Sequence, residues 1–159
     1  MSSNSTIIAL SGKGGVGKTS ISATIVKLLV KAFPDKKILA IDADPAVGLS
    51  TALGIEVKTT IDDIKKEIIF SVEDGQTKEA VELVMYKKIG AIVNRIPDQS
   101  VIEFIDTNGI PVLSYIETDK NLAIYDIEGK NIFNLPDDSN IVNGALKALK
   151  AMEIIKDEI

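Results

Sequence analysis

The chain has 159 residues, of which 45% are apolar and 26% charged, and this is the size and balance of one globular domain. The formal net charge of −5 opposes binding to nucleic acid or to an anionic membrane, and the lysines are too scattered to form a basic patch. The sequence contains no cysteine and no histidine, which excludes disulfides, thiolate metal sites and imidazole bases. We therefore expect one domain over residues 1–159 whose chemistry relies on oxygen ligands and lysines.

The beginning of the chain is polar and lacks a basic segment followed by an apolar run. No apolar stretch of the sequence approaches the ~18 residues that are needed to cross a bilayer. These two features predict a cytoplasmic protein with no membrane partner, and the negative net charge predicts no nucleic-acid partner.

The first part of the chain has the pattern of a strand, a helix and a second strand. Residues 6–10 form a short apolar run that ends in a glycine cluster, which predicts a buried strand followed by a loop. From Ser20 to Phe33 apolar residues recur at helical spacing, and Pro34 ends the pattern. The continuous apolar run in residues 37–42 predicts a second strand, covered on both faces as in a parallel sheet.

Strands and helices continue to alternate in the rest of the chain. In chain order we expect a loop with a short helix at 43–53, helices at 61–72 and 77–85, a strand at 89–93, a helix at 98–107, a strand at 111–116, a short extended pair at 123–128 and 132–135, and a closing helix at 141–155. This alternation predicts an α/β fold with a mainly parallel sheet, right-handed crossovers and flanking helices.

A phosphate-binding motif lies between the first strand and the first helix. Gly12 to Thr19 reads G-K-G-G-V-G-K-T and matches the pattern G-x-x-x-x-G-K-[ST] at every fixed position. Glycines allow the backbone to turn consecutive N–H groups towards a polyphosphate at a helix N-terminus. Lys18 would contact the β- and γ-phosphates, and the Thr19 hydroxyl would hold Mg²⁺. The expected ligands of ATP or ADP are Gly12, Gly14, Gly15, Val16, Gly17, Lys18, Thr19 and Ser20.

The second lysine of the motif, Lys13, carries a resemblance to a known class of proteins. Lys13-Gly-Gly-Val-Gly-Lys-Thr resembles the deviant Walker A loop of the MinD/ParA-type P-loop ATPases, which include the nitrogenase iron protein. In that class the early lysine reaches the nucleotide of the partner subunit, so the resemblance implies a homodimer formed around ATP. A solvated surface lysine is the alternative reading of Lys13.

Two carboxylates follow the second predicted strand, at the edge where open α/β sheets place their ligands. Asp42-Ala43-Asp44-Pro45 resembles the switch I element of the same class. The resemblance implies that Asp44 positions the attacking water and helps to hold Mg²⁺ through its water shell. Asp42 either assists in this role or caps the turn.

The third predicted strand ends in Asn94-Arg95, and the family places an asparagine there to read the adenine edge. The resemblance therefore implies that Asn94 and Arg95 contribute to nucleotide binding, whereas a plain strand-ending asparagine is the alternative. Residues 116–119, after the fourth strand, resemble the loop that flanks the base, although the proline commonly found there is missing.

Within the class, the sequence looks most like the CooC-type ATPases, which insert nickel into carbon monoxide dehydrogenase. The resemblance rests on residues 39–60, on the block that begins at Gly90 and on the Asp126 to Asp138 region. Family members also carry a switch II strand and a C-x-C metal site, and roughly the middle third of a relative has no counterpart here. A sheet without those strands needs cover from helices or from another chain, so we expect either an oligomer or a compact rearranged sheet.

Three functions follow from these observations. The first is an Mg-dependent ATPase that dimerises and serves a metalloenzyme client, with Lys13, Lys18 and Asp44 in catalysis and Thr19 and Asp44 at the metal. The second is a nucleotide-binding module that has lost switch II and turnover. The third is a partitioning or cell-division factor, which the mixed charge of the C-terminal helix does not favour.

Overall fold

The computed structural model describes residues 5–43, 48–57, 60 and 88–156. The helices predicted at 61–72 and 77–85 lie outside the described residues, and so does Asp44. None of the described helices is long and apolar enough to cross a membrane.

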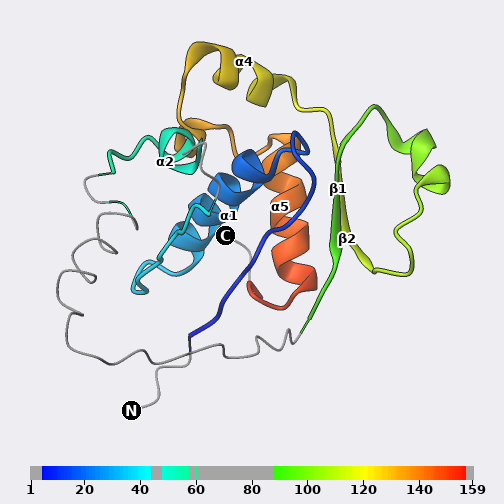
Figure 1. Cartoon of the computed structure of the whole chain (residues 1–159), viewed down its shortest axis with the longest axis horizontal. Helices are drawn as coiled ribbons and strands as arrows, with labels where there is room; N and C mark the ends of the chain where they lie inside the picture. The colour runs from blue at the N-terminus through cyan, green and yellow to red at the C-terminus, as the bar shows by residue number, and fades with distance from the viewer. Residues whose placement is uncertain (1–4, 44–47, 58–59, 61–87, 157–159) are drawn as a thin grey trace, which may run out of the picture.

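Helix α1, Lys18–Ala32, is the central element of the fold (Figure 1). Its buried face is formed by Ile21, Ile25 and Leu28, which recur at the helical spacing that the sequence predicts. The helix ends where Phe33 leaves helical geometry, directly before a proline that cannot continue the hydrogen-bond pattern. Helix α1 packs against three later elements, and the core forms around it.

The remaining elements are short. In chain order they are α2 (Gly48–Leu53), β1 (Ala91–Ile96), the 3-10 helix η1 (Gln99–Phe104), β2 (Val112–Glu117), α4 (Lys120–Glu128), the 3-10 helix η2 (Ile132–Asn134) and α5 (Asn140–Ala151).

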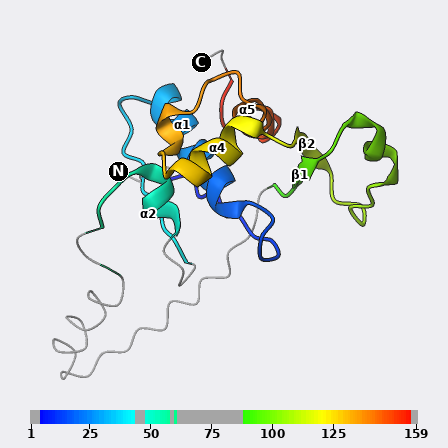
Figure 2. The ribbon, with the colours of Figure 1, turned by 90° about the horizontal axis from the view of Figure 1, so that it is seen from above.

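Strands β1 and β2 pair in parallel, with Ala91 opposite Val112 and Asn94 opposite Ile116. Helix α5 packs on β2 on one side and on α1 on the other, so that the strand pair, α5, α1 and α2 follow one another across the molecule (Figures 1 and 2). The protein therefore has an α/β fold with a parallel sheet and helices packed against it, in a reduced version.

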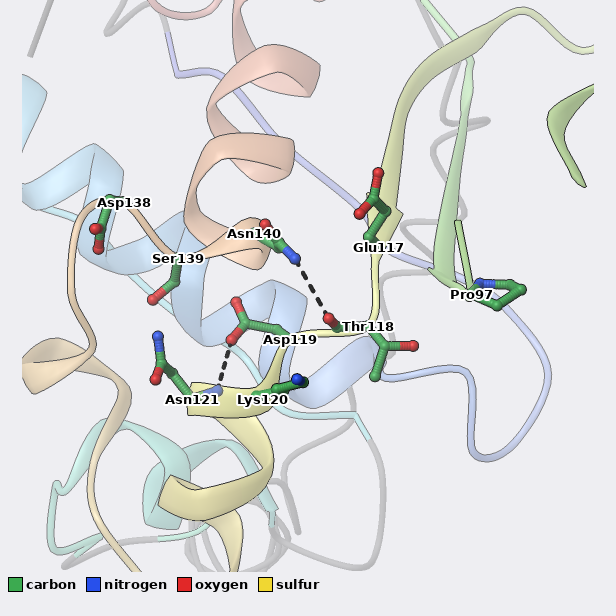
Figure 3. Close-up of a pocket in the computed structure, with 9 residues that line it drawn as sticks. All are labelled: Pro97, Glu117, Thr118, Asp119, Lys120, Asn121, Asp138, Ser139 and Asn140. Atoms are coloured by element: carbon green, nitrogen blue, oxygen red, sulfur yellow. Dashed lines mark hydrogen bonds between the residues drawn. The ribbon is translucent and has the colours of Figure 1, made fainter. Parts of the chain in front are cut away.

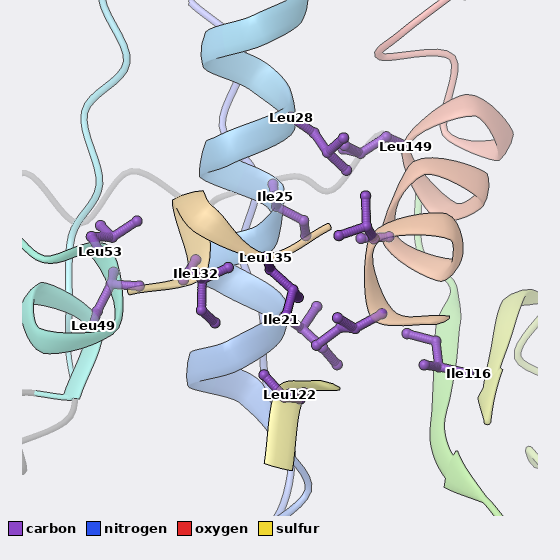
Figure 4. Packing of buried hydrophobic residues seen from close by; sticks show 14 of the residues in the cluster. Ile21, Ile25, Leu28, Leu49, Leu53, Ile116, Leu122, Ile132, Leu135 and Leu149 are labelled. Atoms are coloured by element: carbon purple, nitrogen blue, oxygen red, sulfur yellow. The ribbon is translucent and has the colours of Figure 1, made fainter. Parts of the chain in front are cut away.

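The core lies mainly between helices, and Figure 4 shows it around α1. Helix α5 contributes Ile141, Val142, Ala145 and Leu149, all at most 2% exposed. Ile116 is the part of the strand pair that enters this core, and it is 1% exposed. The other buried members come from α1, from α2, α4 and the η2 region, and from the segment after α5, and they are Ala23, Leu49, Leu53, Leu122, Ile132, Leu135 and Ile155.

Two of the predicted strands are absent from the described structure, and these predictions were wrong. Residues 6–10 and 37–42 have no strand pairing, and Ile7 and Leu39 are each 83% exposed. A continuous apolar run becomes a strand only when a neighbouring strand pairs with it. Among the described residues only β1 and β2 pair, and the core beside them is built from helices.

The extended pair predicted at 123–128 and 132–135 was also wrong. Residues 120–128 form α4, because Asp119 caps its first turn and Gly129 ends it in the left-handed conformation, with φ 63°. Residues 132–134 form η2. The capping residues at both ends outweighed the β-branched character of the segment.

The other predictions hold with shifted bounds. The strands expected at 89–93 and 111–116, the short helix within 43–53 and the closing helix are all present. The helix expected at 98–107 is the shorter η1. Asp98 caps η1, and the hydrogen bonds from Ser100 lower the pKa of its carboxyl group below the ordinary value of 3.8.

Helix α5 approaches β2 closely because residue 144 is a glycine. A Cβ atom added to Gly144 would lie 2.3 Å from Cγ1 of Ile116. We therefore expect Gly144→Ala to destabilise the fold by about 1–3 kcal/mol despite the better helix propensity of alanine, because the core must move to admit the methyl group. Urea unfolding measures the change. Lys147→Ala, on the exposed face of the same helix, is the matched control and should leave stability within about 0.5 kcal/mol of the parent.

Two lysines of α1 hold the segment that leads into α5. Asp137 lies 3.0 Å from Nζ of the buried Lys27 and 2.9 Å from Nζ of Lys31, and Lys27 also donates to the carbonyl oxygen of Leu135. The hydrogen bond from Lys31, followed by that from Lys27, lowers the pKa of Asp137 below 3.8. A carboxylate with a depressed folded-state pKa adds stability above its unfolded pKa, and this stability is lost as the pH falls through the folded value.

Asp137→Asn should accordingly cost about 1 kcal/mol at pH 7, a modest value because the carboxylate is more than half exposed. The difference from the parent should shrink as the pH falls below 3.8 and vanish once the folded carboxyl group is protonated. Urea unfolding across pH 2 to 7 provides the comparison, with Asp126→Asn on the exposed face of α4 as the control. A difference that persisted unchanged at low pH would show that the ion pairs are not its origin.

Candidate functional site

The loop Gly12–Thr19, called the phosphate loop below, leads directly into α1. Gly15 and Gly17 adopt the left-handed conformation, with φ of 79° and 90°. Gly17 is the N-cap of α1 and offers no side chain to the first turn, so the first N–H groups of the helix have no side-chain cap. Uncapped N–H groups at the positive end of a helix are suited to bind an anion.

Lys18 folds back across the phosphate loop. Its Nζ donates to the carbonyl oxygen of Lys13 over 3.4 Å, which places a cation over the loop. The Lys13 side chain is exposed, so it is accessible to solvent or to another chain. Its predicted role across a dimer interface stays a prediction.

Thr19 lies beside the start of α2, the helix that follows the switch I-like segment. A Cβ atom added to Gly48 would meet Cγ2 of Thr19 at 3.3 Å and Oγ1 at 3.5 Å, so the glycine keeps this space open. Oδ2 of Asp42 accepts a hydrogen bond from the backbone N–H of Leu49 at 2.9 Å. Asp42 thus acts as a cap, one of the two roles considered for it.

The Thr19 hydroxyl is an oxygen ligand of the kind that Mg²⁺ accepts. Thr19 would ligate the ion directly, whereas the carboxylate of Asp42 binds the backbone N–H of Leu49. The predicted contribution of Asp44 concerns a residue outside the described part of the chain and stays a prediction.

Asn94 and Arg95, at the end of β1, contact the phosphate loop directly. Nδ2 of Asn94 donates to the carbonyl oxygen of Val16, and Nη1 of Arg95 donates to that of Gly15, each over 3.0 Å. The structure therefore brings together the two motifs that the sequence places far apart. The sequence predicted both residues as ligands of the nucleotide and gave no indication that they would bind the loop.

Residues 7–132 match the CobQ/CobB/MinD/ParA nucleotide binding domain. The chain belongs to this family. The match includes the phosphate loop, β1 and β2, and so covers the elements that the contacts above connect.

Individual relatives of this MinD/ParA-type domain match over shorter segments. An uncharacterized ATP-binding protein of Methanocaldococcus jannaschii is 48% identical over 39% of this chain and 24% of its own length. The carbon monoxide dehydrogenase accessory protein CooC of Rhodospirillum rubrum is 48% identical over 30% of this chain and 18% of its own. The ATPase GET3 of Candida glabrata is 51% identical over 30% of this chain and 13% of its own. The matches thus span a quarter or less of each of these relatives, and no solved structure matches the chain.

A cavity of about 460 Å³ lies at the carboxyl ends of the two strands of the MinD/ParA-type domain (Figure 3). It is lined from β1 and β2 by Pro97, Glu117, Thr118 and Asp119, from α4 by Lys120 and Asn121, and from the start of α5 by Asp138, Ser139 and Asn140.

The α5 side of this cavity was not anticipated. Ser139 is 3% exposed, and its Oγ has no hydrogen-bond partner among the described residues. Nδ2 of Asn140 donates to the carbonyl oxygen of Thr118 over 3.3 Å and joins the two walls. The sequence signal was the Asp-Asp-Ser-Asn run before the closing helix, which is typical of a helix start and indicates that these side chains gather at one end of α5.

Asp119 holds the starts of two helices together at this cavity. Its Oδ1 accepts from the backbone N–H groups of Asn121 and Leu122, and its Oδ2 accepts from that of Ile141 at 3.0 Å. One carboxylate therefore caps α4 and fixes the beginning of α5.

Asp119→Ala should destabilise the domain by about 2–3 kcal/mol, because it removes the cap of α4 and leaves the buried N–H of Ile141 without its acceptor. Asp119→Asn keeps one acceptor oxygen and should cost less than the alanine variant. Urea unfolding of both variants, read by far-UV circular dichroism, gives the comparison. Equal stability of the parent and the alanine variant would contradict the double capping role.

Proposed function

We propose that the chain binds Mg·ATP in the phosphate loop, hydrolyses it, and forms a homodimer around the nucleotide. The observation that carries the proposal is the geometry of the loop. Its two left-handed glycines precede a helix start without a side-chain cap, and a lysine folds back over it. These are the requirements for cradling a polyphosphate.

The phosphates of the nucleotide would be bound by residues of the phosphate loop. Lys18 would leave the Lys13 carbonyl for the β- and γ-phosphates, where a cation neutralises the charge that develops during transfer. Mg²⁺ held at Thr19 would supply an electrostatic clamp on the phosphate oxygens. Asp44 would position the attacking water, and Lys13 would reach the nucleotide of the partner subunit.

The adenine base would occupy the cavity between the strand ends and α5. A volume of about 460 Å³ is within the usual range for small-molecule sites, and the lining offers amide, hydroxyl and carboxylate groups. Asn94 lies two residues before the strand end that leads into the cavity wall at Pro97. Asn94 does not line the cavity, and its amide binds Val16 and Arg95, so its predicted role in reading the base would require the side chain to leave these partners.

We further propose a cytoplasmic protein that acts on a metalloenzyme client. The similarity to an accessory protein of carbon monoxide dehydrogenase supports this choice. The chain has neither cysteine nor histidine, so it offers no thiolate or imidazole ligand for the client's metal.

A nucleotide-binding module without turnover is the second candidate. It is favoured by the segment before switch I, in which Leu39 is 83% and Ile41 63% exposed. A switch I carboxylate needs a fixed strand behind it in order to place water accurately, and residues 37–43 have no such pairing.

Calorimetric titration of Mg·ATP into the parent and into Lys18→Ala tests the proposal, followed by a phosphate-release assay on the same samples. We expect the parent to bind and the variant to lose at least about tenfold in affinity, because a charge-assisted contact to phosphate is worth about 1.5–3 kcal/mol. Lys147→Ala removes the same charge from the exposed face of α5 and should bind like the parent.

The outcomes separate the two candidates. Binding with phosphate release identifies an ATPase, and binding without release identifies the module. A parent that does not bind Mg·ATP contradicts both.

A further inference from the structure

The phosphate loop is held from outside by the residues at the end of β1. Arg95 Nη1 and Asn94 Nδ2 bind the carbonyl oxygens of two consecutive loop residues, Gly15 and Val16, each at 3.0 Å. These bonds join positions about 80 residues apart in the chain. They act on the backbone of the loop rather than on its side chains.

Holding these two carbonyl groups also sets the direction of two N–H groups. A trans peptide unit is planar, so its carbonyl oxygen and the N–H of the next residue point in opposite directions. With the Gly15 and Val16 oxygens turned towards β1, the N–H groups of Val16 and Gly17 must point away from β1. A row of N–H groups turned to one side forms a concave anion site.

The end of β1 is shaped to make these contacts. Arg95 has φ 62°, which is uncommon for a residue with a Cβ atom, and the pairing register of β1 shifts between Asn94 and Ile96. Oδ1 of Asn94 accepts from the backbone N–H of Arg95 at 2.9 Å and supports this kink. Both donors of the pair therefore emerge from the bend.

The fit also limits what can stand at residue 17. A Cβ atom added to Gly17 would lie 2.5 Å from Nδ2 of Asn94, and φ there is 90°. Residue 17 therefore cannot carry a side chain while Asn94 stands at the end of β1.

We propose that Arg95 and Asn94 are positioning residues that preorganise the phosphate loop for the polyphosphate group of the ligand. This inference rests on the proposed function, because it assigns a role within the same nucleotide site. It differs from base recognition in one measurable respect. If the two residues act through the loop, their loss should also weaken the binding of a phosphate ligand that has no base.

The experiment compares Mg·ATP with Mg·tripolyphosphate, a base-free ligand, by calorimetry and by competition. Arg95→Ala and Asn94→Ala should each weaken the binding of both ligands by about tenfold, the effect of losing a hydrogen bond worth about 1.4 kcal/mol. Lys147→Ala is the matched control for the loss of one positive charge from the chain and should bind both ligands like the parent.

Arg95→Gly separates positioning from a general structural role. Glycine adopts φ 62° without strain, so this variant should melt at or above the temperature of the parent. It lacks the guanidinium group, so it should still bind tripolyphosphate about tenfold more weakly. Amide resonances of Val16 and Gly17 should shift in the same variant, since their peptide planes lose an anchor.

Each outcome has one meaning. Unchanged tripolyphosphate affinity in Arg95→Ala, Arg95→Gly and Asn94→Ala overturns the inference, even if Mg·ATP affinity falls. A parent that binds Mg·ATP but not tripolyphosphate also overturns it, because a preorganised loop does not require a base. A parent that binds neither ligand contradicts the proposed function itself.

Discussion

The close packing of α5 between α1 and β2 is the constraint on which the rest of the structure depends. Gly144 allows the α5 backbone to reach Ile116, the residue through which the strand pair enters the core. On its other side α5 packs on α1, the helix that begins at the phosphate loop. One helix therefore sets the distance between the phosphate loop and the ends of the strands. A nucleotide site formed by the phosphate loop and the strand ends therefore depends on the packing of α5 for its geometry.

Asp119 extends the same constraint to the cavity. The carboxylate directly follows β2 and accepts backbone hydrogen bonds from both α4 and α5, so the walls of the cavity share one anchor. The ion pairs of Asp137 with Lys27 and Lys31 act in the same way just before α5 begins, by tying the segment that leads into it to α1. Buried packing supplies most of the stability, whereas these polar links decide how the helices are oriented around the site.

The sequence predicted the parts of the fold that depend on local signals. The helical spacing of Ile21, Ile25 and Leu28 correctly predicted α1, and the motif correctly placed a glycine loop before it. It failed where the outcome depends on a neighbour. Leu39 lies in a run that favours a buried strand and is exposed because no described strand pairs with that run. Ser139 likewise joins the candidate site through tertiary packing, which spacing along the chain does not encode.

The unpaired segment before the phosphate loop makes the contacts from β1 more important. In the predicted fold a paired strand would hold the loop at one end and α1 at the other. Here residues 5–11 have no strand pairing, and the segment is held by the packing of Ile8 and Leu10 against the core rather than by strand hydrogen bonds. A glycine-rich loop without a paired strand before it has many accessible conformations, and ordering it costs about 1–2 kcal/mol per residue. The hydrogen bonds from Asn94 and Arg95 restrict the middle of the loop and reduce the part of that cost that a ligand would otherwise bear.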